Sequence, residues 1–190
     1  MMAAKYLTKA TDLAKNFIVS VLKAGDVAID ATMGNGNDTV FLAELVGETG
    51  KVYAFDIQER ALQQTEIKLS NQQLIHRTEL IHSGHENMRQ YIHEEVSVVM
   101  FNLGYLPKGD HHIVTKAHTT IEGIKQGLAL LKTNGILTLA IYHGHPEGLG
   151  EKEAVLAFVK TLNQKLFNVL HMEFINQANR PPILVVIEKK

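Results

Sequence analysis

The residues best suited to chemistry lie in residues 27–39, VAIDATMGNGNDT, where an apolar stretch runs into a glycine-rich turn. Gly34 and Gly36 allow the backbone to turn sharply and to approach a ligand closely, because neither carries a Cβ atom. Asn37 or Asp38 can cap the helix that follows, whose free N–H groups would face a ligand over the turn. Such a turn is typical of a nucleotide-cofactor site, although a GxG sequence alone also occurs in turns that bind nothing.

Two further segments could complete such a site. Asp56 follows the apolar residues 51–55 and lies 20 residues beyond Gly36, where a carboxylate can accept hydrogen bonds from both ribose hydroxyls of an adenosine. The alternative is a solvated carboxylate at the end of a strand. Ser83 and His85 follow a third short strand and are placed to meet the adenine edge. The predicted cofactor-binding residues are Asp30, Gly34, Asn35, Gly36, Asn37, Asp38, Asp56, Gln58, Ser83, His85 and Asn102.

The most strand-like run of the chain is VSVVMF, residues 96–101, and it ends at NLGYLP. The amide oxygen of Asn102 and the carbonyls of the turn could hold the hydrogens of an amine while leaving its lone pair exposed. Tyr105 offers a flat face for a base or another planar group. An asparagine that only caps a turn is the alternative.

Ten histidines raise the question of a metal site. His111 and His112 are adjacent and therefore point in different directions. Neither this pair nor His143 and His145 has the spacing of HExxH or a comparable ligand set. We therefore predict no metal, and expect histidines on these loops to form hydrogen bonds with substrate or phosphate.

Basic residues near the strand ends could contact phosphate, and they include Lys108, Lys116 and Arg180, with Arg89 nearby. Scattered lysines on such a surface also serve solubility, so both interpretations stay open.

The periodicity of apolar residues predicts the elements that position these side chains. Predicted helices cover 11–22, 39–46, 59–72, 86–93, 115–131 and 151–166, and predicted strands cover 27–30, 51–55, 78–82, 96–101, 136–142, 171–176 and 183–188. Alternation of strands and helices implies a doubly wound, mostly parallel α/β sheet with helices on both faces. The last two strands lack an intervening helix, so we expect an antiparallel hairpin at one edge. The chain is predicted to be a single domain over residues 1–190.

Composition limits the function classes. The chain has 190 residues, no cysteine and a formal net charge of −1, which fits a cytoplasmic α/β domain without disulfides. No secretory leader or membrane-spanning run is apparent. A nucleic-acid partner would have to bind a local basic patch, because the net charge of the chain does not indicate such a partner.

Together these strand-end residues resemble the class I S-adenosylmethionine-dependent methyltransferases. DATMGNGNDT resembles their cofactor turn, Asp56 resembles their ribose-binding acid, and NLGYLP resembles the Asn/Asp-Pro-Pro-Tyr motif of enzymes that methylate amino nitrogens, with Leu103 and Gly104 in place of Pro-Pro. More narrowly, DATMGNGNDTVFLA, FDIQ, FNLGYLPKGD and YHGHPEG resemble the bacterial family labelled as rRNA methylases, over nearly the whole chain.

Members of that family methylate the aminomethyl group of a modified wobble uridine in tRNA. The resemblance therefore implies S-adenosylmethionine as cofactor, the tRNA anticodon stem-loop as partner and a homodimer. The expected catalytic residues are Asn102, Tyr105, Asp110 and His145, of which Asp110 and His145 are the candidates for a general base. The expected substrate-binding residues are Tyr105, Leu106, Pro107, Lys108, Gly109, Thr115, Tyr142, His143 and Arg180.

Other functions stay open at this point. Methylation of rRNA or of a small amine would use the same cofactor, and a net charge near zero suits a small substrate. An NAD-dependent oxidoreductase is disfavoured because GNGNDT lacks the third glycine of GxGxxG. A catalytically silent cofactor-binding module should lack an organised turn after the fourth strand, where this chain carries NLGYLP.

Overall fold

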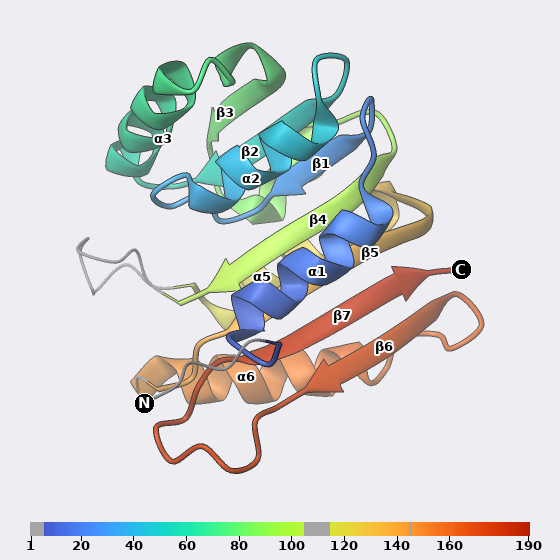
Figure 1. Cartoon of the computed structure of the whole chain (residues 1–190). Coiled ribbons are helices and arrows are strands. Elements are labelled where there is room, and N and C mark those ends of the chain that lie inside the picture. Colours follow the sequence, from blue (N-terminus) through green and yellow to red (C-terminus); the bar gives the residue numbers. More distant parts are fainter. Residues whose placement is uncertain (1–5, 105–114, 145) are drawn as a thin grey trace.

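Helices and strands alternate, except for the last two strands, along the described residues, which are 6–104, 115–144 and 146–190 of this computed structural model (Figure 1). The helices are α1 (Ala10–Val21), α2 (Asn37–Val46), α3 (Glu59–Asn71), α4 (Met88–Tyr91), α5 (Ala117–Leu130) and α6 (Pro146–Val159), with short 3-10 turns η1 (Ile75–Arg77) and η2 (His85–Asn87). The strands are β1 (Val27–Asp30), β2 (Lys51–Asp56), β3 (Thr78–His82), β4 (Val96–Leu103), β5 (Leu131–Ile141), β6 (Phe167–Met172) and β7 (Ile183–Lys189). No helix among the described residues is long and apolar enough to span a membrane.

Seven strands form one sheet in the order β3-β2-β1-β4-β5-β7-β6. The strands β1 to β5 pair in parallel, whereas β7 pairs antiparallel with both β5 and β6. This arrangement confirms the predicted doubly wound sheet with an antiparallel edge hairpin.

Side chains alternate between the two faces of the sheet, as the two-residue period of a strand requires. Residues such as Ala28, Val98 and Met100 face the layer of α1 and α2, which lies in front of the sheet in Figure 1. Their neighbours Val99 and Phe101 face α4, α5 and α6 on the opposite side. Because both faces of β4 are covered, its side chains are apolar apart from Ser97 and Asn102.

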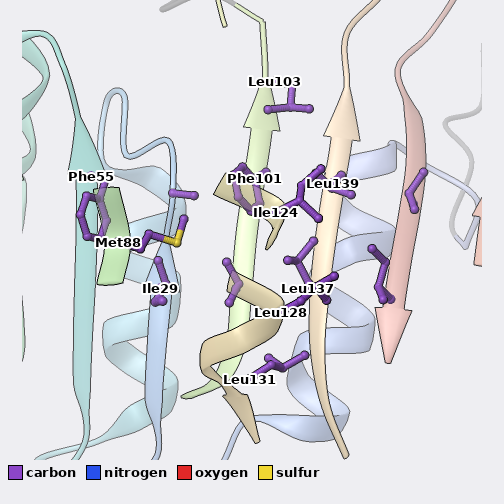
Figure 2. Packing of buried hydrophobic residues seen from close by; sticks show 14 of the residues in the cluster. Ile29, Phe55, Met88, Phe101, Leu103, Ile124, Leu128, Leu131, Leu137 and Leu139 are labelled. Carbon is purple, nitrogen blue, oxygen red and sulfur yellow. The ribbon is translucent and has the colours of Figure 1, made fainter. Parts of the chain in front are cut away.

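The larger core cluster lies between the sheet and α5 (Figure 2). Phe55 of β2, Phe101 of β4 and Leu137 of β5 pack there against Met88 and Ile124, and all five side chains are fully buried. Burial of each such side chain stabilises the fold by roughly 1.5–3 kcal/mol. The carboxyl end of β4 is therefore held rigidly, and with it Asn102.

β1 and β4 are neighbours although β2 and β3 come between them in the chain. The crossovers after β1 and after β4 consequently leave the sheet in opposite directions. Such a switch in strand order opens a crevice beyond the carboxyl ends of the strands, where ligands bind in this class of fold.

Several predicted boundaries are wrong at the C-terminal edge. The sixth strand is β6, Phe167–Met172, and not 171–176, and the helix before it is Pro146–Val159, and not 151–166. An edge strand has few buried positions to mark it, and most of β6 is exposed. Ile175, which suggested a strand residue, is 96% exposed in the following loop.

Other differences are local. The predicted helix 86–93 is one 3-10 turn followed by a single α-helical turn, and β4 extends to Leu103. β5 pairs with β4 already at Leu131, and the register then shifts so that Ile136 pairs with Val98. The predicted loop before residue 136 is thus an exposed excursion inside a longer strand. α1 begins at Ala10 after the N-cap residue Lys9, which has no side-chain cap, one residue before the predicted start at 11.

Candidate functional site

A cavity of about 670 Å³ lies at the crevice beyond the carboxyl ends of the parallel strands. The segments after β1, β2, β3 and β4 line it, together with the start of α5 and the side chains of Thr11 and Lys15 from α1. These strand-end segments are the ones that the sequence predicts to meet at one rim.

The glycine-rich turn forms one wall of this cavity. The Gly34 N–H donates to Asp56 Oδ2 at 3.0 Å, and the Gly34 carbonyl accepts from Thr65 Oγ1 at 3.2 Å. Gly36 has a φ of 74°, and a Cβ there would lie 2.8 Å from Thr65 Oγ1. Gly36 is therefore required for packing against α3. It was predicted to contact the cofactor, but it does not line the cavity.

The N-terminus of α2 differs from the prediction. Its N-cap is Gly36, without a side-chain cap, so neither Asn37 nor Asp38 fills that position. Both side chains instead line the cavity. The uncapped backbone N–H groups of this helix carry partial positive charge, which favours an anionic or polar ligand group beside the turn.

Asp56 ends β2 and lines the cavity. Its Oδ1 accepts from the Gln58 N–H at 2.9 Å, while Oδ2 holds the Gly34 N–H. Burial raises the pKa of Asp56, and these backbone hydrogen bonds act in the opposite direction. Each carboxylate oxygen retains a further lone pair, so Asp56 can accept from a diol as well as hold the turn.

Asp30 is buried beneath the turn and does not line the cavity. Its carboxylate accepts from Thr39 Oγ1 at 2.6 Å and from the Thr32 N–H at 3.2 Å. Burial raises the pKa of Asp30 to about 7, and the nearby carboxylates of Asp38 and Asp56 contribute in the same direction. Asp30 was predicted to contact the cofactor. In the structure it instead stabilises the turn and the start of α2 through these two hydrogen bonds.

Asn102 lies at the carboxyl end of β4, in the cavity wall. Its backbone N–H donates to Thr32 Oγ1 at 2.7 Å, and its side-chain Nδ2 donates to Asp38 Oδ2. Asn102 Oδ1 is buried and has no hydrogen-bond partner among the described residues. An unpaired buried acceptor is costly, and it indicates a place for a donor from a ligand.

His85 contributes a second buried acceptor. Its Nδ1 lies 3.2 Å from the Ala31 carbonyl oxygen, which can only accept, so Nδ1 carries the proton. Burial lowers the pKa of His85 and favours the neutral ring, whose edge packs on Phe101 at 5.3 Å between ring centroids. Nε2 is then an acceptor, and within the described part of the chain nothing bonds to it.

On the α5 side, Thr115, Lys116 and His118 line the cavity, and Tyr142 lines it from the end of β5. Thr115 Oγ1 donates to Glu151 Oε2 at 2.7 Å, and Thr120 Oγ1 donates to Oε1 of the same carboxylate at 2.6 Å. The Glu151 side chain is buried. Its two hydrogen bonds connect α6 to Thr115 in the cavity wall and to Thr120 of α5.

The cavity brings together eleven of the predicted site residues: Gly34, Asn35, Asn37, Asp38, Asp56, Gln58, Ser83, His85, Asn102, Thr115 and Tyr142. His143 is buried outside its lining, and Arg180 is exposed on the loop between β6 and β7. The remaining predicted residues lie outside the described residues: Tyr105, Leu106, Pro107, Lys108, Gly109, Asp110 and His145. In the part of the chain that the structure describes, no three His, Asp or Glu side chains could hold a metal ion.

Sequence reasoning missed the contribution of α1. Lys15 Nζ lies 2.7 Å from Asp38 Oδ1 and over the ring of Phe41, and Thr11 lines the cavity one turn earlier. In the sequence α1 is an ordinary amphipathic helix, and no motif marks its polar residues. Thr32 also lines the cavity, and its position inside the glycine-rich turn sequence is a signal that could have identified it.

Comparison with known proteins gives consistent matches. The sequence profile of the family described as "Putative rRNA methylase" matches residues 52–188. The chloroplastic tRNA (mnm(5)s(2)U34)-methyltransferase of Arabidopsis thaliana is 34% identical over 192 residues, covering 96% of this chain and 70% of that protein.

Solved structures are similar over almost their full length. A protein from Clostridium thermocellum described as a "putative rRNA-methylase" is 50% identical with a TM-score of 0.97, covering 98% of this chain and all (100%) of that one. A protein from Streptococcus mutans described as a "putative methyltransferase", solved in complex with SAH, is 43% identical with a TM-score of 0.89, covering 97% and 99% of the two chains.

Proposed function

Because the chain belongs to the "Putative rRNA methylase" family, we propose that this S-adenosylmethionine-dependent methyltransferase acts on the 5-aminomethyl group of the modified wobble uridine in tRNA. The product would be the 5-methylaminomethyl nucleoside, with or without a 2-thio group. The Arabidopsis relative, named a tRNA (mnm(5)s(2)U34)-methyltransferase, supports tRNA as the substrate class.

The cavity fits S-adenosylmethionine, whose demethylated product SAH is bound in the Streptococcus mutans relative. When bound, this cofactor supplies a methyl group that is already activated on a sulfonium sulfur. The uncapped backbone N–H groups at the start of α2 would hold its polar groups, and Asp56 would accept from its ribose hydroxyls. Among the described residues that line the cavity, His85 Nε2 and Asn102 Oδ1 are the buried acceptors without a partner, which ligands would satisfy.

The observation that carries the N-methylation proposal is the unpaired Asn102 Oδ1. An amide oxygen accepts an N–H of a primary amine and leaves the nitrogen lone pair free to attack. Since the methyl donor is activated, the protein chiefly has to align nitrogen, carbon and sulfur. Desolvation in the cavity favours the neutral amine over the ammonium, which is the form that can attack.

Other predicted roles remain part of this proposal. Tyr142 lines the cavity and offers a flat face for a planar base. Tyr105 as a stacking residue, and Asp110 or His145 as a general base, stay predictions. A homodimer also stays a prediction, which sedimentation of the purified chain would test.

The test is methyl transfer by the purified chain from labelled S-adenosylmethionine to synthetic anticodon stem-loops. A stem-loop that carries 5-aminomethyluridine should accept a methyl group, and mass spectrometry should identify the methylaminomethyl nucleoside. The same stem-loop with unmodified uridine is the matched control and should not react. tRNA from cells that lack this chain should accumulate the aminomethyl nucleoside.

Two outcomes would redirect the proposal. Methylation of rRNA with none of the stem-loop would make rRNA the substrate, in line with the family description "Putative rRNA methylase". Methylation of free aminomethyl nucleosides at a rate equal to that of the stem-loop would make the enzyme a small-amine methyltransferase.

A further inference from the structure

A chain of three side chains from three separate elements ends at Asn102. Lys15 of α1 lies 2.7 Å from Asp38 Oδ1, at the start of α2. The other oxygen of the same carboxylate, Oδ2, accepts from Asn102 Nδ2 at the end of β4. Both oxygens of Asp38 are thus engaged, one by a cation and one by the amide of the residue that faces the acceptor amine in the proposed reaction.

An asparagine amide can turn over because its oxygen and nitrogen ends are similar in shape. The two orientations differ in chemistry, since Oδ1 only accepts and Nδ2 only donates. Oδ1 toward the amine takes one of its N–H groups. Nδ2 toward the amine would donate into the lone pair that has to attack the methyl group, and would thereby inhibit transfer.

Asp38 selects between these orientations because a carboxylate only accepts. With Nδ2 held by Asp38, Oδ1 is left as the free acceptor, in agreement with its lack of a partner among the described residues. The backbone of Asn102 is fixed as well, by its N–H bond to Thr32 Oγ1. Only rotation of the side chain remains to be controlled.

We propose that Asp38, supported by Lys15, is a positioning residue that fixes the Asn102 amide with Oδ1 toward the acceptor amine. This inference rests on the proposed N-methylation, and it assigns to Asp38 a role other than cofactor contact. Lys15 holds the carboxylate in place and offsets its charge beside the buried Asp30.

A double-mutant cycle tests the proposal. Asp38→Ala should lower kcat on the aminomethyl stem-loop about ten- to a hundredfold, with the affinity for S-adenosylmethionine unchanged within about twofold. Asn102→Ala should lower kcat at least as much. The double variant should be no slower than Asn102→Ala alone, because Asp38 acts through Asn102. Asp38→Asn, which retains an acceptor oxygen, should recover most of the loss.

The role of Lys15 has a matched control. Lys15→Met should lower kcat severalfold. Lys51 also forms a 2.7 Å ion pair, with Glu79, and also lies over an aromatic ring, that of Tyr53. It lies at the amino end of β2, whereas the cavity lies beyond the carboxyl ends of the parallel strands. Lys51→Met should therefore leave kcat unchanged.

A second measurement does not depend on the substrate. In nuclear magnetic resonance spectra, the Asn102 side-chain NH₂ signal, assigned by its loss in Asn102→Ala, should exchange with water more slowly than those of exposed asparagines. Asp38→Ala should abolish this protection, and Lys51→Met should preserve it. If the wild-type chain methylates no aminomethyl RNA, the proposed function fails while this measurement still decides whether Asp38 fixes the amide.

Two results would overturn the inference directly, and a third would reassign Asp38. One is an additive loss of kcat in the double variant, which would give Asp38 a role independent of Asn102. The other is unchanged exchange of the Asn102 NH₂ group in Asp38→Ala. A loss of S-adenosylmethionine affinity in Asp38→Ala that matches the loss of kcat would make Asp38 a cofactor ligand instead.

Discussion

Asp56 Oδ2 accepts the backbone N–H of Gly34 at 3.0 Å, and so the end of β2 holds the turn that follows β1. One carboxylate thereby connects the two strands whose ends form the cofactor side of the cavity. A change at Asp56 should consequently affect both ligand affinity and the stability of the turn.

Asp56→Ala should weaken binding of S-adenosylmethionine by roughly 1–3 kcal/mol, because hydrogen bonds to a charged acceptor are lost. It should also lower the free energy of unfolding, since the Gly34 N–H loses its partner. Calorimetric titration and urea unfolding measure the two effects. Glu79→Ala, which removes an exposed carboxylate on the adjacent strand, should change neither by more than about 0.5 kcal/mol. Wild-type affinity in Asp56→Ala would contradict the assignment.

Gly36→Ala should destabilise the fold by roughly 1–3 kcal/mol, because the new Cβ would lie 2.8 Å from Thr65 Oγ1 and 3.0 Å from Thr65 Cα, at a φ of 74°. Urea unfolding measures the change. A Cβ at Gly150 in α6 would meet no atom within 4 Å, so Gly150→Ala is the matched control and should be neutral or slightly stabilising. Equal effects of both substitutions would show that packing against α3 does not require Gly36.

Asp30 should make stability fall as pH rises. Its folded-state pKa is raised to about 7, so the folded chain binds this proton more tightly than the unfolded chain does. The resulting stability is fully present below the ordinary pKa of an aspartate and is lost as pH rises through 7. From pH 5.5 to pH 8 this contribution should decrease by about 2 kcal/mol.

Comparison of Asp30→Asn with the wild type, by urea unfolding across this pH range, isolates that contribution from other titrating groups. The control is Asp26→Asn. Burial of Asp26 is outweighed by its hydrogen bonds from Lys132 and the Lys23 backbone, so its pKa lies below the ordinary value. Asp26 is therefore ionised in both states above pH 5.5, and its substitution should lower stability equally at all these pH values. A wild-type pH slope in Asp30→Asn would exclude Asp30 as the source.

Lys116 should contribute to RNA binding if the anticodon stem-loop occupies the cavity mouth, because Lys116 lines the cavity. Lys116→Ala should weaken stem-loop binding and reduce the slope of log affinity against log salt by about 0.7. Fluorescence anisotropy over several potassium chloride concentrations measures this. Arg180→Ala is predicted to act in the same direction, while Lys165→Ala, before β6 and far from the cavity edge, should bind as the wild type does. Unchanged salt slopes in both rim variants would place the RNA on another face.

The sheet and most of the cavity wall could be predicted from sequence because parallel strands deliver their last residues to one edge. Asp56, Ser83 and Asn102 each follow an apolar run, so their meeting requires only the alternation of strands and helices. The separate structural roles of residues within one motif could not be predicted. Asp30, Gly36 and Asp38 lie within one motif, yet one supports the turn, one packs on α3 and one holds an amide of β4.

The failures have two physical origins, and the first is contact between segments that are distant in the sequence. Lys15 reaches Asp38 only because α1 packs across β4 and β5, and nothing in its local sequence indicates this. The boundaries of β6 failed for the opposite reason, because an exposed edge strand has little burial to impose a pattern. Local apolar runs therefore predict the positions of buried strands well. They do not predict the bounds of edge strands or the ion pairs that join separate elements.

The place of β7 between β5 and β6 has a consequence for the order in which the chain folds. β6 precedes β7 in sequence but reaches the sheet only by pairing with it. During synthesis, residues 167–172 must therefore wait, unpaired, until residues 183–189 have emerged. We expect pulse-labelled hydrogen exchange during refolding to protect β6 no earlier than β7. Earlier protection of β6 would mean that it first docks elsewhere and then moves to its final neighbour.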